Sequence, residues 1–253
     1  MLPRTPSYRL DGKRAVVIGG SRGIGLGCAV ALAEQGASVV IVARSKGQVF
    51  ETVNEMKSEG FSVSGAPMDV SIIDNVKNLM GEYSDIDILV NSAGIARHTP
   101  TVDTTELDFD DVMSVNVRSA YFLAQSAAKQ MISKGTGGSI IQISSQMAHV
   151  GGIDRAVYCG TKHAIEGINK SMAIEFGPHK IRVNSICPTF IRTPFTEPTF
   201  KDPEKVKWIE SKIKVGRVGE VEDIMGAVKF LASDVSAMVT GSSILIDGGW
   251  TAG

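Results

Sequence analysis

Residues 15–25 read Ala-Val-Val-Ile-Gly-Gly-Ser-Arg-Gly-Ile-Gly, and this stretch decides the fold prediction for the chain. The first four residues form a short apolar run, typical of a buried strand, that leads directly into a glycine-rich turn. Apolar residues then recur at helical spacing over residues 24–32, and Gly36 stands where a helix would end. A second apolar run follows at residues 38–42. The stretch therefore predicts a strand–helix–strand unit with parallel strands.

The glycine-rich turn has the pattern of a dinucleotide-binding loop. Glycine permits a tight turn and lets the backbone approach a pyrophosphate closely, while the start of the helix supplies free N–H groups and a positive dipole end. Such turns also occur merely to pack a helix on a strand, and this alternative stays open for the turn alone. The residues expected to contact the dinucleotide here are Gly19, Ser21, Arg22, Gly23, Ile24 and Gly25.

Tyr158 and Lys162 are candidates for proton-transfer chemistry. If their segment is helical, a separation of four residues places the phenol and the ammonium one turn apart on one face. A free phenol has a pKa of about 10, and a nearby positive charge lowers that pKa and turns the tyrosine into a usable acid or base. The alternative is an ordinary contact on a helix surface.

Apolar runs alternate with helical patterns along the chain, and several runs are apolar on both faces, as strands covered on both sides by helices are. We expect an α/β, doubly wound Rossmann fold: a seven-stranded parallel sheet with helices on both faces. A chain of 253 residues can bury a sizeable core, so we expect a single domain over residues 1–253. The expected strands are residues 15–18, 38–42, 61–67, 86–90, 139–143, 181–186 and 243–246.

Residues 189–215 interrupt this alternation with regularly placed prolines and aromatic side chains. Such an insertion beyond a strand end is typical of a binding loop, and we expect a substrate lid at about 189–215, with an ordinary connector as the alternative. The prolines are Pro194, Pro198 and Pro203, and the aromatic residues among them are Phe195, Phe200 and Trp208.

Composition narrows the function classes. Lys and Arg number 26 against 27 Asp and Glu, which gives a formal net charge of −1 and predicts no nucleic-acid partner and no anionic membrane surface. No apolar run is long enough for a membrane span, and no signal peptide is recognisable. The three cysteines, Cys28, Cys159 and Cys187, have no metal-ligand or CxxC spacing, so we expect reduced thiols in a cytoplasmic protein. The four histidines share no ligand spacing either, so no metal is expected.

Further motifs resemble those of the short-chain dehydrogenase/reductase family, and they follow its order over almost the whole chain. The glycine loop agrees with the family pattern except that Ile18 stands where threonine is usual, and Thr189 replaces the glycine that usually follows Pro188. The other matching residues are Asn91-Ser92-Ala93-Gly94, Ser145, Tyr158, Lys162, Cys187-Pro188, Thr193, Val239-Thr240-Gly241 and Asp247-Gly248-Gly249.

The resemblance implies a reaction and an active site. It implies that hydride transfer interconverts a secondary alcohol and a ketone, with Tyr158 moving the proton, Ser145 bonding the same oxygen and Lys162 holding the ribose. Asn116 would help to hold a water that connects Lys162 to solvent. The resemblance also implies a homotetramer, because the family commonly pairs long helices between subunits. Residues 105–134 carry a long helical pattern of this kind. Further cofactor contacts are expected from Asp69, Val70, Asn91, Ala93, Gly94, Tyr158, Lys162, Pro188, Ile191 and Thr193.

Charge at the end of the second strand bears on the choice of cofactor. NAD enzymes usually carry a carboxylate there for the ribose 2′-hydroxyl, but this chain reads Arg44-Ser45 after the strand. Arg44 and Arg22 could flank a 2′-phosphate, because guanidinium groups bind phosphate well. We therefore expect NADP(H) to be favoured over NAD(H), with Ser45 as a further contact.

The substrate is read from residues 94–100, which resemble the matching stretch of gluconate 5-dehydrogenases within the family. This favours a sugar acid or a polyol, with Arg97 pairing with a substrate carboxylate and Met147 and His149 as further pocket residues. A 3-oxoacyl-thioester reductase is the alternative enzyme. A non-catalytic dinucleotide-binding sensor is the alternative of another class, and the intact Ser145, Tyr158 and Lys162 set argues against it.

Overall fold

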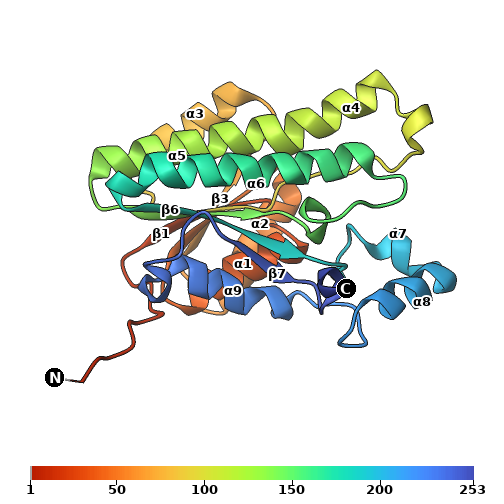
Figure 1. Cartoon of the computed structure of the whole chain (residues 1–253). Helices are drawn as coiled ribbons and strands as arrows, with labels where there is room; N and C mark the ends of the chain where they lie inside the picture. The colour runs from red at the N-terminus through yellow and green to blue at the C-terminus, as the bar shows by residue number, and fades with distance from the viewer. Residues whose placement is uncertain (1) are drawn as a thin grey trace.

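The structure, a computed structural model that describes residues 2–253, has one parallel sheet between two layers of helices (Figure 1). Its seven strands lie in the order β3-β2-β1-β4-β5-β6-β7, and every neighbouring pair is parallel. The predicted fold class is therefore confirmed. The strands are β1 (Arg14–Ile18), β2 (Ser38–Ala43), β3 (Val63–Pro67), β4 (Ile88–Asn91), β5 (Gly138–Ile143), β6 (Ile181–Pro188) and β7 (Ser243–Ile246).

Helices cover both faces of this sheet because the strands are apolar on both sides. In β1, Val17 packs into the core below helices α1, α2 and α9, while its neighbour Val16 packs into the core with α3, α5 and α6. Both side chains are fully buried. The helices are α1 (Gly23–Glu34), α2 (Lys46–Ser58), α3 (Ile73–Glu82), α4 (Glu106–Met113), α5 (Ala120–Lys134), α6 (Ala156–Phe176), α7 (Glu197–Phe200), α8 (Pro203–Lys212) and α9 (Glu222–Ala232).

Two strands begin later than the apolar pattern predicts. Phe61 and Ile86 lie in the turns that precede β3 and β4. The Phe61 N–H donates to the carbonyl of Met56 at the end of α2, and the Ile86 N–H donates to the carbonyl of Tyr83 after α3. Both residues are apolar because they pack under a helix end, which a run of apolar letters does not distinguish from a strand.

The helical pattern at residues 105–134 is confirmed, but the helix is not uniform. α4 and α5 are joined by a π-helical segment at Ser114–Ser119, with wider turns than an α-helix. Such segments are rare and occur often at functional sites. Asn116, one of the predicted active-site residues, lies in it.

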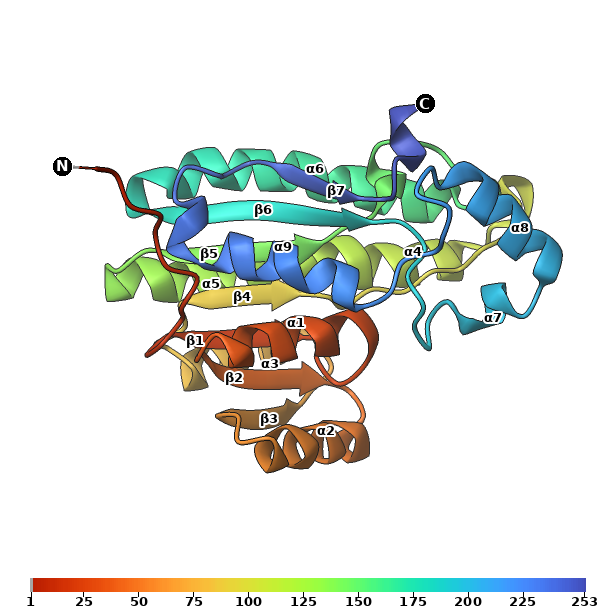
Figure 2. The same cartoon turned by 90° about the horizontal axis from the view of Figure 1, so that it is seen from below.

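The insertion after β6 forms α7 and α8, which project beyond the carboxyl ends of the strands (Figure 2). Its two ends are joined to each other, because the Gly219 N–H donates to the Phe190 carbonyl and the Arg192 N–H to the Gly219 carbonyl, both at 2.9 Å. Among residues 2–253, none of the helices combines the length and the apolar character that crossing a bilayer requires.

Candidate active site

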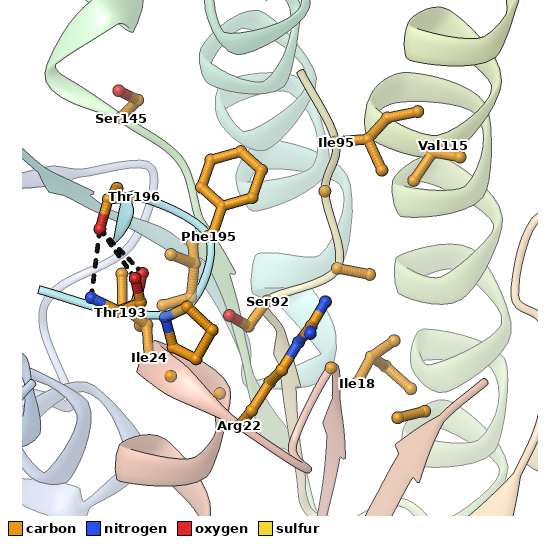
Figure 3. Close-up of a pocket in the computed structure, with 18 of the residues that line it drawn as sticks. Ile18, Arg22, Ile24, Ser92, Ile95, Val115, Ser145, Thr193, Phe195 and Thr196 are labelled. Atoms are coloured by element: carbon orange, nitrogen blue, oxygen red, sulfur yellow. Dashed lines mark hydrogen bonds between the residues drawn. The ribbon is translucent and has the colours of Figure 1, made fainter. Parts of the chain in front are cut away.

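A cavity of about 710 Å³ opens at the carboxyl edge of the sheet, where the loops after six strands meet (Figure 3). Its size is sufficient for a dinucleotide end and a small organic molecule. Ligands of doubly wound sheets bind beyond the carboxyl ends of the strands, so this cavity lies where the sequence predicts the site.

The glycine-rich turn forms one wall of the cavity and is packed too tightly for larger residues at two of its glycines. Gly19 has a φ of 75°, and a Cβ on it would come within 3.1 Å of the Ser92 backbone. A Cβ on Gly25 would collide with the carbonyl oxygen of Gly19. Helix α1 begins at Gly23 without an acidic residue in its first turn, so its N–H groups and dipole are uncompensated. These features fit a pyrophosphate group.

Nearly all predicted cofactor residues line this cavity. Asn91 does not: it is buried, its Nδ2 donates to Gln142 Oε1 at 2.8 Å, and its Oδ1 accepts from the Ala93 N–H at 3.2 Å. Asn91 therefore shapes the loop instead of facing the cavity. The lining residues that the sequence predicted are Gly19, Ser21, Arg22, Gly23, Ile24, Gly25, Arg44, Ser45, Asp69, Val70, Ala93, Gly94, Tyr158, Lys162, Pro188, Ile191 and Thr193.

Two arginines give one end of the cavity a positive charge. Arg22 extends from the glycine-rich turn into the space in Figure 3, and Arg44 follows β2. Within residues 2–253, neither guanidinium has a carboxylate at ion-pair distance. Their placement is suited to an anionic group next to the end of β2.

The predicted catalytic residues Ser145, Tyr158 and Lys162 converge on the same cavity. Lys162 Nζ donates a hydrogen bond of 3.0 Å to the carbonyl of Ile143 and lies 5.6 Å from the centre of the Tyr158 ring. Burial lowers the pKa of Lys162 to about 8. Ser145, just after β5, caps the following turn by accepting from the Met147 N–H at 3.1 Å.

The pKa of Tyr158 corrects part of the sequence argument. A lowered pKa was expected from the neighbouring ammonium, but burial raises the pKa of the phenol, although Ser145 and the charge of Arg155 act in the opposite direction. The phenol is therefore neutral at neutral pH in this structure. Ionisation needs a further positive charge near its oxygen.

Asn116 joins three parts of the site from its place in the π-helical segment. Its Oδ1 accepts from the Ile95 N–H at 2.9 Å, and its Nδ2 donates to the Ile95 carbonyl at 2.9 Å and to Thr161 Oγ1 at 3.2 Å. A Cβ on Gly94 would lie 3.5 Å from Asn116 Oδ1 and 3.8 Å from Lys162 Nζ. Asn116 thus ties the loop after β4 to α6 beside the lysine. Its contact with a water stays a prediction.

Of the three residues predicted for substrate binding, two line the cavity and one does not. Met147 and Arg97 line the cavity, but Arg97 also pairs with Asp108 at 3.4 Å and Asp111 at 3.8 Å, which offsets its charge. His149 is exposed and does not line the cavity. The expectation that His149 faces the substrate is therefore not met, because its side chain lies toward α6 and β6.

Three polar side chains that the sequence did not single out as ligands line the same end of the cavity. Both amide atoms of Gln146 and Thr189 Oγ1 are buried without a hydrogen-bond partner among the described residues, while the Ser144 hydroxyl is bonded to the Cys187 thiol. Gln146 is only 1% exposed. Buried polar atoms are normally paired, so the unpaired atoms are suited to a polar ligand or bound water. A sequence signal existed only for Thr189, which departs from the family pattern.

The insertion after β6 contributes Phe195 and the Thr193–Thr196 turn to the cavity wall (Figure 3). Thr196 Oγ1 accepts from the Thr193 N–H at 3.1 Å, and this bond fixes the loop between β6 and α7. Phe190, at the start of the loop, is buried and packs 5.7 Å from the ring of Trp250. Trp250 also meets Trp208 of α8, at 5.4 Å between ring centres.

His149, Glu166 and Cys187 form a cluster next to the cavity, with potential ligand atoms within 4.8 Å of one another. Sequence spacing could not show it, because the three residues come from different elements. The Glu166 carboxylate accepts from Ser185 Oγ at 2.7 Å and from Ser243 Oγ. Burial raises the pKa of the Cys187 thiol to about 12, which opposes the thiolate that metals bind. The cluster is therefore a hydrogen-bonded link between α6, β6 and β7.

Comparisons with known proteins agree with this geometry. A family model described as enoyl-(acyl carrier protein) reductase matches residues 18–251. The L-xylulose reductase of Bos taurus is 37% identical over 244 residues, covering 96% of this chain and 98% of that protein. A gluconate 5-dehydrogenase from Burkholderia cenocepacia, solved with NADP and tartrate, superposes with a TM-score of 0.94 at 34% identity, over 97% of this chain and 98% of its own. A short-chain type dehydrogenase/reductase from Mycobacterium marinum superposes with a TM-score of 0.91 at 37% identity, over 97% and 98% of the two chains.

The fold, the glycine-rich turn and the Ser145, Tyr158 and Lys162 set together define an oxidoreductase that acts on CH–OH groups with a nicotinamide dinucleotide. The chain belongs to the short-chain dehydrogenase/reductase family. The resemblance predicted from its motifs is thereby confirmed.

Proposed function

We propose that this protein is an NADP-dependent oxidoreductase that interconverts a secondary alcohol and a ketone in a sugar acid or a polyol. The observation that carries the substrate class is the group of unpartnered buried polar atoms on Gln146 and Thr189 at one end of the cavity. A hydroxyl-rich substrate supplies hydrogen-bonding groups to such a wall, whereas an alkyl chain supplies none. Relatives named for gluconate and L-xylulose support the same class.

The side chains divide the chemistry among them. The nicotinamide, when bound, supplies or accepts the hydride. Tyr158 is the proton donor in reduction, and its raised pKa keeps the proton on its oxygen until the substrate oxygen gains charge. Ser145 is suited to bond the same oxygen, and Lys162 is held by Ile143 where its ammonium can reach a ribose hydroxyl. The proton lost by Tyr158 returns through Lys162 and solvent.

The preference for NADP rests on Arg22 and Arg44. Both line the cavity next to the end of β2, and neither forms an ion pair within 4.0 Å with a carboxylate of residues 2–253. The absence of Asp or Glu after this strand removes the usual acceptor for a free 2′-hydroxyl. The solved relatives that hold NADP support this assignment.

Residues 189–215 are proposed to act as a lid over the substrate. The two backbone bonds between Gly219 and the Phe190–Arg192 stretch fix its base, while α7 and α8 lie outside the sheet. We also propose that the protein works in a reducing cytoplasm, which is consistent with Cys28, Cys159 and Cys187 being buried and unpaired.

Turnover across a panel tests the proposal. Purified protein is assayed with NADP(H) and NAD(H) on D-gluconate, L-xylulose, polyols, simple secondary alcohols and a 3-oxoacyl thioester. We expect the largest kcat/KM on a sugar acid or polyol with the phosphorylated cofactor. A thioester optimum would favour the alternative reductase, to which the family model's description is closer. Cofactor binding without turnover on any member would favour a sensor.

A further inference from the structure

Arg155 carries an unpaired positive charge at the substrate end of the cavity. It lies three residues before Tyr158, immediately before α6 begins, and its half-buried side chain lines the cavity. Over residues 2–253, its guanidinium makes no ion pair within 4.0 Å. A partly desolvated cation without a counter-charge is unfavourable, and an anionic ligand would relieve that cost.

The ionisable groups around Arg155 leave its charge uncompensated at neutral pH. Burial lowers the pKa of the guanidinium itself, and the neighbours that oppose this shift are Tyr158, Cys159 and Asp154. Tyr158 and Cys159 are neutral, because burial raises the pKa of each. Asp154 is exposed, so solvent weakens its effect. Burial, with help from Arg155, lowers the pKa of His98 to about 4, so this imidazole is uncharged as well.

Arg155 is also held in position. Its guanidinium carbon lies 5.3 Å from the centre of the Phe190 ring, and Phe190 is fixed by Trp250 behind it. Gly152 makes room for the stem, since a Cβ there would come within 2.9 Å of Arg155 Cδ. Stacking on an aromatic face leaves the N–H edges of a guanidinium free for a planar acceptor. The stem is therefore pre-organised, while the hydrogen-bonding edge of the guanidinium has no partner among the residues that the structure describes.

Arg97, the arginine that the sequence predicted to bind a substrate carboxylate, differs from Arg155 because it already has carboxylate partners. It already faces Asp108 and Asp111, and its side chain is 48% exposed. A substrate carboxylate at Arg97 would have to compete with two carboxylates, whereas at Arg155 it would meet none at that distance.

We propose that Arg155 is the carboxylate-binding subsite of this enzyme, so that the substrate is an anionic sugar acid whose carboxylate is held there while its reacting carbon faces Tyr158. The inference rests on the proposed function and deepens it, because it separates a sugar acid from a neutral polyol. A bidentate pair would fix the orientation of the substrate as well as attract it.

The test uses two ligands that differ only at one end. D-gluconate carries a carboxylate where D-glucitol carries a hydroxymethyl group, and neither reacts with enzyme saturated with NADPH, because ligand and cofactor are both reduced. Calorimetric titration of that complex gives both dissociation constants. In Arg155→Met, which keeps an apolar stem on Phe190, we expect D-gluconate to bind about 10- to 100-fold more weakly while D-glucitol changes less than about threefold. Arg155→Lys should recover part of the loss.

Arg14→Met is the matched control, because Arg14 also lies over an aromatic ring, with its guanidinium carbon 5.8 Å from the centre of the Tyr83 ring, but pairs with Asp85 outside the cavity. It should leave both constants unchanged, and all variants should keep the wild-type NADPH affinity. Equal losses of affinity for both ligands in Arg155→Met would overturn the assignment, and so would a selective loss of D-gluconate binding in Arg97→Met instead. Oxidation of D-gluconate by the wild-type enzyme would uphold the proposed function in either case. A wild-type enzyme that binds and oxidises D-glucitol but not D-gluconate would refute the sugar acid itself.

Discussion

The ammonium of Lys162 donates a hydrogen bond of 3.0 Å to the backbone carbonyl of Ile143, the last residue of β5. This bond crosses from α6 to the sheet and holds the lysine beside the Tyr158 ring. The active-site lysine is thus positioned by the fold before any ligand contributes. A buried ammonium with a single carbonyl partner remains poorly solvated, which is why its pKa falls to about 8.

The lowered pKa predicts how cofactor binding depends on pH. Lys162 is protonated below pH 8 and loses its proton as the pH rises through about 8. Because the ammonium is the form that donates to a ribose hydroxyl, we expect NADPH affinity to be constant below that pH and to fall above it, by up to about tenfold per unit. Fluorescence titration between pH 6.5 and pH 9.5 measures this. Lys162→Met should bind more weakly with no such fall in the same window, and a wild-type profile that is flat up to pH 9.5 would contradict the prediction.

Removal of the Tyr158 hydroxyl tests the proton donor. Tyr158→Phe keeps the ring that Lys162 and Arg155 approach but removes the acid, so NADPH affinity should change little and kcat should fall by about 10²- to 10⁴-fold. Steady-state kinetics and cofactor titration on the same preparation separate the two effects. Near-normal turnover would show that another group transfers the proton.

The sequence predicted the parts of this site whose roles depend on residues close together in the chain. The glycine-rich turn and the Tyr158–Lys162 spacing are recognisable because their roles depend on residues a few positions apart. The bond between Asn91 and Gln142 could not be predicted, because Gln142 lies 51 positions away on the next strand. Arg155 was not predicted from the sequence either, because its surroundings also depend on residues distant in the chain.

What distinguishes Arg97 from Arg155 is the presence or absence of nearby carboxylates, and this depends on how α4 and α6 pack. The same holds for Gln146, whose unpaired amide is significant only because it is buried. Charge and residue type can be read from a sequence, but partners and burial of single side chains depend on tertiary contacts. The raised pKa of Tyr158 is another such case, since burial outweighs the neighbouring charges.

Arg44→Ala tests the choice of cofactor. Only NADPH carries the 2′-phosphate, so the variant should lose about 1.5–3 kcal/mol of NADPH binding, one to two decades in Kd, while NADH binding changes little. Dissociation constants for both cofactors, measured by fluorescence, give the ratio directly. An equal loss for both would mean that Arg44 does not contact the phosphate.

Two glycines with opposite surroundings test the tight packing of the turn. A Cβ on Gly25 would collide with the Gly19 carbonyl oxygen, so Gly25→Ala should lower the free energy of unfolding by at least about 2 kcal/mol and abolish NADPH binding. Gly226 lies within α9, and beyond its chain neighbours and its own helix backbone no atom lies within 4 Å of an added Cβ. Gly226→Ala should therefore raise stability by about 0.5–1 kcal/mol and leave binding intact. Urea denaturation of both variants provides the comparison, and a Gly25→Ala protein as stable as the wild type would contradict it.

The subunit exposes apolar surface and an open sheet edge, and both features predict that it assembles with further copies. β7 ends the sheet with Leu245 42% exposed, and Ile174 on α6 is 78% exposed. Open edges and apolar patches favour association, so we expect a homotetramer built from the long helices and the β7 edge. Light scattering should give four times the subunit mass, and Ile174→Glu should reduce it. Phe50→Glu, which changes an exposed apolar residue on α2 beside the opposite edge of the sheet, should leave the mass unchanged (Figure 2). A wild-type mass equal to one subunit, independent of concentration, would refute the assembly.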